Sequence, residues 1–359
     1  MSMARAVRAQ QKTVLSIGFL SSVSPEPTAA YMTAFRQALS EQGYIEGKSV
    51  AIEYHWAEGH YDRLPELAAD LVSRKVDVIA ASGDAAVLAA KSQTSTIPIV
   101  FFNGGDPVAM GLIASLARPG GNVTGFSTIA AELVPKRLEL LSELVPLARV
   151  VALLIHPNDP NAERFISDMQ EATRTKGLQL HVLRAGTETE VDDAFASLAQ
   201  SHADGLVVSP NALFVARRER IVELASRNAV PAIYGRRQFV TAGGLISYGS
   251  SLTTVYRRMA LYVAKVLSGA TPGDLPVQQP AIFELVVNLK TADALGLTVP
   301  PSILAAPTRS LSELASSKCG DDRLGLCPAD RAAATATTSW SGWPPLTSGR
   351  ALSAGEVRA

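Results

Sequence analysis

The chain has 359 residues, two to three times the length of an ordinary domain of about 100–150 residues, so we expect two structural lobes. Its 33 basic and 33 acidic residues cancel, which argues against nucleic-acid binding, because such proteins normally carry a basic surplus. Hydrophobic residues make up 47% of the chain, enough for two cores, yet no apolar run reaches the roughly 18–20 residues that span a bilayer.

In the first third of the chain, short β-branched runs alternate with amphipathic helical stretches. This rhythm is typical of βαβ units and a parallel sheet. In chain order, the pattern predicts strands over 14–20, 50–54, 76–80 and 97–102, with helices over 29–42, 61–74 and 85–92.

The pattern then restarts after a seam near residues 124–129. It predicts helices over 130–144, 161–176, 190–200, 217–227, 253–267 and 291–295, and strands over 150–155, 179–184, 205–208, 232–234, 245–248 and 282–288. Two successive α/β units, each a doubly wound parallel sheet, are the simplest account. From about residue 306 the periodicity is lost, and residues 306–359 are expected to be disordered.

Motifs for catalysis or cofactor binding are absent from the sequence. The stretch from Gly43 to Ser49 has three residues between its glycines where a phosphate-binding loop needs four, and it follows a helix instead of a strand. No G-x-G-x-x-G follows the first strand, and no G-x-S-x-G or H-E-x-x-H occurs. Both cysteines, Cys319 and Cys327, lie in the tail. We therefore expect no enzyme activity, no cofactor and no metal site.

Polar loops follow the predicted strands, at the carboxyl ends where doubly wound sheets bind ligands. Ser22 and Ala85 could donate backbone N–H groups to a carboxylate, and Asp84 or Asp106 could meet an ammonium group. The alternative is that these Ser, Asp and Asn residues only cap helices. Further loops of this kind lie at 156–159, 209–211 and 234–236.

Several long stretches carry a resemblance to a known family: residues 43–54 (GYIEGKSVAIEY), 97–127 (IPIVFFNGGDPVAMGLIASLARPGGNVTGFS), 247–249 and 274–297. From about residue 14 to 304 the chain resembles the ABC-transporter substrate-binding proteins once catalogued as a domain of unknown function and related to tryptophan- and tyrosine-associated binding proteins. The resemblance implies a type I periplasmic-binding fold, in which two lobes joined by three crossovers close on a ligand about a hinge.

The resemblance also implies the domain organisation and the ligand-binding residues. The expected lobes are 13–126 with 250–278 returning to it, and 127–249 with 279–305 returning to it. By position in the loops, the expected ligand-binding residues are Ser21, Ser22, Asp84, Ala85, Asp106, Ser127, Asn211, Phe214, Tyr234 and Tyr248. Phe214 and Tyr234 could stack on an apolar ligand group or could equally belong to the core.

The function implied is that of the extracytoplasmic component of an ABC importer. Such a protein captures a small molecule, here an amino acid that is aromatic or branched, and delivers it to a permease in the membrane. We expect a periplasmic monomer with no nucleic-acid partner. Two alternatives remain open: a cytoplasmic small-molecule sensor, for which residues 1–13 are too short to hold a helix-turn-helix, and a doubly wound enzyme, which would need a nucleophile–base pair or a cofactor loop.

Both ends of the sequence depart from the family pattern. Residues 1–12 look like the remnant of an export leader, because Val7-Arg8-Ala9 fits a cleavage site but the apolar region is missing. Residues 306–312 read APTRSLS, which a one-base shift relates to a family-like ending RADEVIE. We hypothesise that a frameshift produced the tail.

Overall fold

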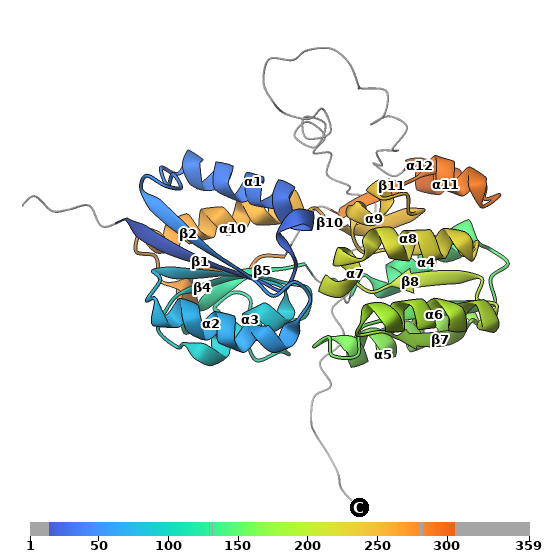
Figure 1. The fold of residues 1–359 in the computed structure, drawn as a ribbon, viewed down its shortest axis with the longest axis horizontal. Helices are drawn as coiled ribbons and strands as arrows, with labels where there is room; N and C mark the ends of the chain where they lie inside the picture. The colour runs from blue at the N-terminus through green and yellow to red at the C-terminus, as the bar shows by residue number, and fades with distance from the viewer. Residues whose placement is uncertain (1–13, 129, 131, 280–282, 306–359) are drawn as a thin grey trace, which may run out of the picture.

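The computed structural model describes residues 14–128, 130, 132–279 and 283–305. The predicted leader and the predicted disordered tail lie outside the described residues. The described part forms two α/β lobes side by side, with strands and helices alternating along the chain (Figure 1). None of its helices combines the length and the apolar character needed to cross a bilayer.

The first lobe is built on a five-stranded parallel sheet in the order β2-β1-β3-β4-β5. Its strands are β1 (Leu15–Ser21), β2 (Val50–Trp56), β3 (Val78–Ser82), β4 (Ile99–Asn103) and β5 (Val123–Ser127). One face of the sheet is covered by α1 (Pro25–Glu41) and α10 (Leu252–Leu267), and the other by α2 (Leu64–Ser73) and α3 (Asp84–Gln93). Two short 3-10 helices complete the lobe: η1 (Tyr61–Arg63) before α2 and η2 (Pro272–Asp274) after α10.

The side chains of β1 show how the sequence pattern builds this layered structure. Ile17 and Phe19 point to the α1–α10 face and join its core, whereas Leu20 points to the α2–α3 face, as the period of two in a strand requires. A Cβ at Gly18 would lie 2.8 Å from a methyl group of Leu71, so this glycine lets α2 pack closely on the sheet.

The second lobe is built on a six-stranded sheet in the order β11-β10-β9-β8-β6-β7. Its strands are β6 (Val150–Ile155), β7 (Gln179–Arg184), β8 (Gly205–Val208), β9 (Ala232–Tyr234), β10 (Ile246–Ser250) and β11 (Phe283–Val287), of which β11 alone pairs antiparallel. One face carries α4 (Val134–Leu144), α5 (Ala162–Lys176), α11 (Leu289–Ala294) and α12 (Pro301–Ala305), and the other α6 (Glu188–Ser201), α7 (Ala212–Ala216), α8 (Arg218–Arg227) and α9 (Arg237–Thr241).

The order of the described elements takes the chain from one lobe to the other three times: after β5, after β10 and before β11. The predicted fold class of two doubly wound, mainly parallel lobes is thus confirmed. The exact domain boundaries given from the sequence stay a prediction.

The structure differs from the predicted elements at several places, among them strand β5, which no predicted strand covers. Helix α1 begins at Pro25, four residues before the predicted start, because proline fits the first helical turn, where its missing N–H is not needed. The predicted helix over 217–227 is found as α8, and the structure adds the short helix α7 before it, which the pattern did not predict. The last strand, β11, runs antiparallel to β10, whereas the sequence pattern predicted a parallel sheet.

Candidate ligand-binding cleft

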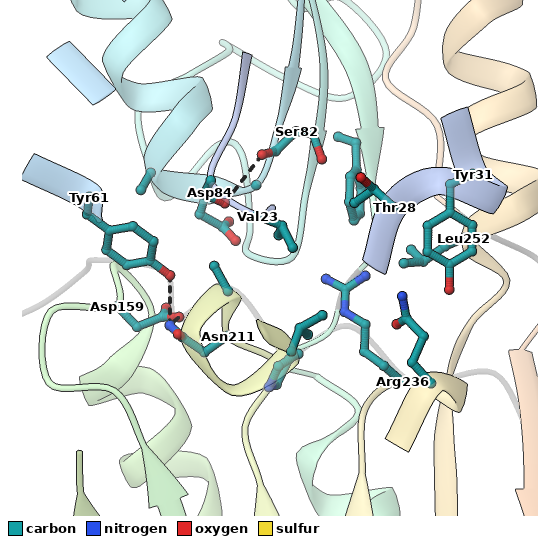
Figure 2. Close-up of a pocket in the computed structure, with 18 of the residues that line it drawn as sticks. Val23, Thr28, Tyr31, Tyr61, Ser82, Asp84, Asp159, Asn211, Arg236 and Leu252 are labelled. Atoms are coloured by element: carbon teal, nitrogen blue, oxygen red, sulfur yellow. Dashed lines mark hydrogen bonds between the residues drawn. The ribbon is translucent and has the colours of Figure 1, made fainter. Parts of the chain in front are cut away.

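A cavity lies between the two lobes, at the carboxyl ends of strands from both sheets (Figure 2). The empty space in it, including the part open to solvent, is about 570 Å³. The part of it that can hold a water-sized molecule is only about 50 Å³, so the space between the lobes is tight. Its walls come from the residues that follow β1, β3, β6, β8 and β9, so both lobes contribute.

The first-lobe wall depends on a tight approach between the ends of β1 and β3. Ser22 donates its backbone N–H to the carbonyl of Ser82 at 3.2 Å and its hydroxyl to the same carbonyl at 3.4 Å. Gly83, at a φ of 99°, precedes α3, and a Cβ there would overlap the Ser22 hydroxyl. This arrangement brings the first turn of α3, with Asp84 and Ala85, to the cavity surface.

The Asp84 carboxylate is held by the loop after β4. Its Oδ1 accepts the N–H of Gly105 at 2.9 Å, and its Oδ2 accepts the N–H of Gly104 at 3.1 Å. It also lies at the N-terminus of α3, where the helix dipole favours a negative charge. Asp84 is therefore fixed in place by uncharged groups, with its side chain at the cavity surface.

A second carboxylate, Asp159, enters the cavity from the loop after β6. It accepts the backbone N–H of Asn161 at 2.9 Å and the side-chain amide of Asn211 at 3.0 Å. Burial, together with the negative charge of Asp84, raises the pKa of the Asp159 carboxyl to about 6. The charge of Asp84 thus reaches Asp159 across the space between the lobes.

Polar contacts join the lobes around the cavity, and Arg164 of α5 also pairs with Asp106 of the first lobe at 3.9 Å. Asn211 of the second lobe donates its side-chain amide to the hydroxyl of Tyr61 of the first lobe at 2.7 Å, the contact drawn in Figure 2. Burial raises the pKa of the Tyr61 hydroxyl well above its usual range, so it stays protonated. At the rim, Arg218 pairs with Glu26 at 3.1 Å, and Gln238 donates to the carbonyl of Pro27 at 2.5 Å. The structure is therefore that of a closed cleft.

Arg236 supplies a positive charge to the opposite side of the cavity. It follows β9, and its guanidinium lies 5.7 Å from the ring centroid of Phe102. It forms no hydrogen bond or ion pair with any other described residue. The same side chain also borders a smaller space of about 330 Å³ next to the connections between the lobes. A cation without a counterion at a cleft wall is suited to bind an anionic ligand group.

Apolar and aromatic side chains cover the wall near Arg236. Tyr31 lies 5.5 Å from Tyr256, ring centroid to ring centroid, and the Tyr256 hydroxyl hydrogen-bonds the Ser82 hydroxyl at 2.8 Å. Burial raises the pKa of Tyr31 to about 12. Val23 and Leu252 extend this apolar surface, so the cavity offers charged groups at two sides and an apolar region between lobes.

Four of the residues predicted from the sequence line this cavity: Ser22, Asp84, Ala85 and Asn211. Three others have local structural roles outside it. Ser21 accepts the N–H of Val23 at 3.1 Å, Ser127 donates to the carbonyl of Gly105 at 2.8 Å, and Asp106 accepts the N–H of Val108 at 2.9 Å.

The three predicted aromatic residues also lie away from the cavity. Phe214 and Tyr234 are buried in the core of the second lobe, and Tyr234 stacks on Phe239 at 4.5 Å. Tyr248 packs beside Phe283 at 5.9 Å, and its carbonyl accepts a hydrogen bond from Arg137. Ligand contact by the predicted residues stays a prediction.

Sequence reasoning missed three charged or polar residues that the cavity brings together: Tyr61, Asp159 and Arg236. Asp159 and Arg236 lie in loops at 156–159 and 234–236 that the sequence pattern had indicated, so their acidic and basic side chains could have been selected there. Nothing in the pattern distinguished Tyr61, which follows β2 and meets its partner only when the lobes close.

Two α/β lobes with a polar cleft between them, lined from both sides, define a two-lobed small-molecule binding protein. The particular family follows from comparison with known proteins. Residues 16–311 match the model of the family described as ABC transporter substrate binding protein, and the chain belongs to this family.

Individual proteins agree with this assignment. The chain is 28% identical to a tyrosine-binding protein of Clostridioides difficile (strain R20291) over 263 residues, which are 73% of this chain and 75% of that protein. Among solved structures, a conserved domain protein from Vibrio cholerae O1 biovar El Tor is 27% identical, with a TM-score of 0.77, over 83% of this chain and 99% of that one.

Two further structures share the fold. The ABC domain from Streptococcus pneumonia, in complex with L-Trp, is 24% identical, with a TM-score of 0.74, over 81% of this chain and 97% of that one. An open, ligand-free substrate binding protein with adhesive properties from Clostridium difficile is 27% identical, with a TM-score of 0.60, over 80% of this chain and 97% of that one. These proteins support a solute-binding role and a reading of the chain as a non-enzyme.

Proposed function

We propose that this protein is the extracytoplasmic solute-binding component of an ABC importer, and that its ligand is an amino acid with an aromatic or branched apolar side chain. It captures the ligand between its lobes and delivers it to a permease in the membrane. It acts as a periplasmic monomer, without catalysis and without a nucleic-acid partner. Family membership and the tyrosine-binding relative support this function.

One observation about the site supports an amino acid as the ligand. The cavity holds two carboxylates, Asp84 and Asp159, on one side and the guanidinium of Arg236, which lacks a counterion among the described residues, on the other (Figure 2). An α-amino acid carries an ammonium and a carboxylate group, which complement these charges. The apolar and aromatic wall between them suits a side chain without charge.

A binding screen on the full chain tests this proposal. A ligand that binds only the folded state raises the melting temperature in proportion to RT ln(1 + [L]/Kd). We expect a dose-dependent rise with L-tyrosine, L-tryptophan or L-leucine, and no rise with glucose or ribose. A rise with a sugar, or none with any amino acid, would overturn the proposed ligand class.

A further inference from the structure

The two carboxylates of the cavity belong to different lobes. Asp84 begins α3 in the first lobe, and Asp159 follows β6 in the second. Both line the same closed cavity, which Figure 2 shows with the two carboxylates facing it. The negative charge of Asp84 acts on Asp159 in this arrangement, and opening of the cleft separates them, since each moves with its own lobe.

Neither carboxylate has a positive counterion. Among the described residues, no Lys, Arg or His forms an ion pair with Asp84 or Asp159. Their hydrogen-bond donors are all neutral: backbone N–H groups for Asp84, and the Asn161 and Asn211 amides for Asp159. A carboxylate offers about four acceptor positions, so each retains capacity for another donor.

We propose that Asp84 and Asp159 form a carboxylate gate: their mutual repulsion opposes closure of the empty cleft, and the ligand's cationic amino group, placed between them, permits it. This inference rests on the proposed function, because it assigns the amino end of the ligand to these two residues. It makes the amine the recognition group and the trigger for closure.

A cationic amine fits the gate better than a metal ion does. No group of three or more His, Cys, Asp or Glu residues that could hold a metal occurs in the described part of the chain. Ions such as Ca²⁺ take about 6–8 oxygen ligands, far more than two carboxylates supply. An ammonium group has three N–H donors and a single charge, and it can bond both carboxylates at once.

A proton is the other cation that can relieve the repulsion. In the closed cleft the pKa of Asp159 is raised from 3.8 to about 6. Because the raised pKa belongs to the closed state, protonation favours closure at pH below the ordinary carboxyl value, and this benefit is lost as the pH rises through about 6. The other titratable groups close to Asp159 are Asp84 on α3, Tyr61 on η1, which stays protonated, and His156 on its own loop, whose pKa burial lowers.

The size of the effect follows from the shift. Two pKa units correspond to a change of about 100-fold in an equilibrium that is linked to one proton. Because burial is a larger cause of the shift than the charge of Asp84, about 100-fold is the upper limit for the fall in the ratio of closed to open molecules between acid and neutral pH without ligand.

Small-angle X-ray scattering of the full chain without ligand tests the gate, since closure reduces the radius of gyration. We expect the wild type to be compact at about pH 4 and more extended at about pH 7.5, because Asp159 is ionised only at the higher value. Asp159→Asn should be compact at both pH values. The matched control is Asp62→Asn, which removes an exposed carboxylate one residue from Tyr61 and outside the cavity, and it should behave as the wild type.

Measurements with added ligands distinguish failure of the gate from failure of the proposed function. At about pH 7.5, L-tyrosine should compact the wild type, whereas 3-(4-hydroxyphenyl)propionate, which lacks the amine, should not. If L-tyrosine binds but the wild type shows no pH effect and Asp159→Asn stays extended, the gate is wrong and the function stands. If no amino acid binds but Asp159→Asn is compact, the gate stands and the ligand class is wrong. Should Asp159→Asn fail to fold, Asp84→Asn carries the same test.

Discussion

Two arginines of the second lobe lie near each other, but one is buried and hydrogen-bonded within the chain and the other is not. Arg137, on α4, is 1% exposed and donates to two carbonyl oxygens, of Tyr248 at 2.9 Å and of Ala130 at 3.1 Å. Arg236, at the cavity, has no such partner among the described residues. Burial and the charge of Arg236 lower the pKa of Arg137 to about 10, so it remains charged at neutral pH.

This difference separates a structural charge from a binding charge. Arg137 joins the connection after β5 to strand β10, next to the second connection between the lobes, and glycines make room for it. A Cβ at Gly235 would lie 3.2 Å from its guanidinium, and one at Gly249 would overlap the Gly235 carbonyl. A charge that holds the fold together has its hydrogen bonds satisfied within the chain, whereas a charge that awaits a ligand does not.

The largest expected effect comes from removing the structural charge. Arg137→Ala leaves two carbonyls without donors and an unfilled space, so we expect the free energy of unfolding to fall by about 3–5 kcal/mol. Urea denaturation measures this. Arg149→Ala, at an exposed position, is the control and should change the unfolding free energy by less than about 0.5 kcal/mol. If Arg137→Ala lowers the free energy of unfolding by less than about 1 kcal/mol, Arg137 does not have the structural role that distinguishes it from Arg236.

The binding charge should show the reverse behaviour. Arg236→Ala removes a charged donor from the ligand and, from the fold, only the contact with the Phe102 ring, so we expect Kd for L-tyrosine to rise about 10–100-fold with little change in melting temperature. Titration calorimetry measures the affinity. Arg236→Lys should keep part of the affinity. The control Arg63→Ala changes an exposed residue outside the cavity and should leave the affinity unchanged. A large drop in melting temperature for Arg236→Ala would instead make Arg236 structural.

The smallest effect on ligand affinity is expected at the rim of the cavity, where the charged side chains are paired with each other and exposed to solvent. Glu26 is 76% exposed, and its partner Arg218 also pairs with Glu219 at 2.7 Å. Glu26→Gln should therefore weaken ligand binding no more than about twofold, and added salt should reduce the same contact in the wild type. Affinities measured at low and high salt for both proteins check this. A tenfold loss of ligand affinity in Glu26→Gln would show that the Glu26–Arg218 pair contributes to binding as Arg236 does.

The sequence carried the parts of the site that follow from local pattern. The buried strands ending at Ser82 and Ile155 were recognisable as apolar runs, and ligand loops follow the carboxyl ends of such strands. Asp84 and Asn211 were selected for this reason, and both line the cavity.

Other parts depend on contacts between distant residues. Asn211 and Tyr61 are 150 positions apart, and the acidity of Asp159 depends on Asp84 in the other lobe. Tyr234 shows a further limit: β9 is buried on both faces, so alternation could not reveal whether its ring points to ligand or to core.

The interleaving of the lobes has a consequence for synthesis on the ribosome. The core of the first lobe includes Val255, Met259 and Val263 of α10, which are translated only after all strands of the second lobe except β11. The second lobe in turn lacks β11 until the first lobe has received α10. Neither lobe can complete its core while the other is still unmade, so nascent chains expose apolar surface until nearly all of the described residues have emerged. The two lobes should therefore complete their cores together, late in synthesis, and not one after the other.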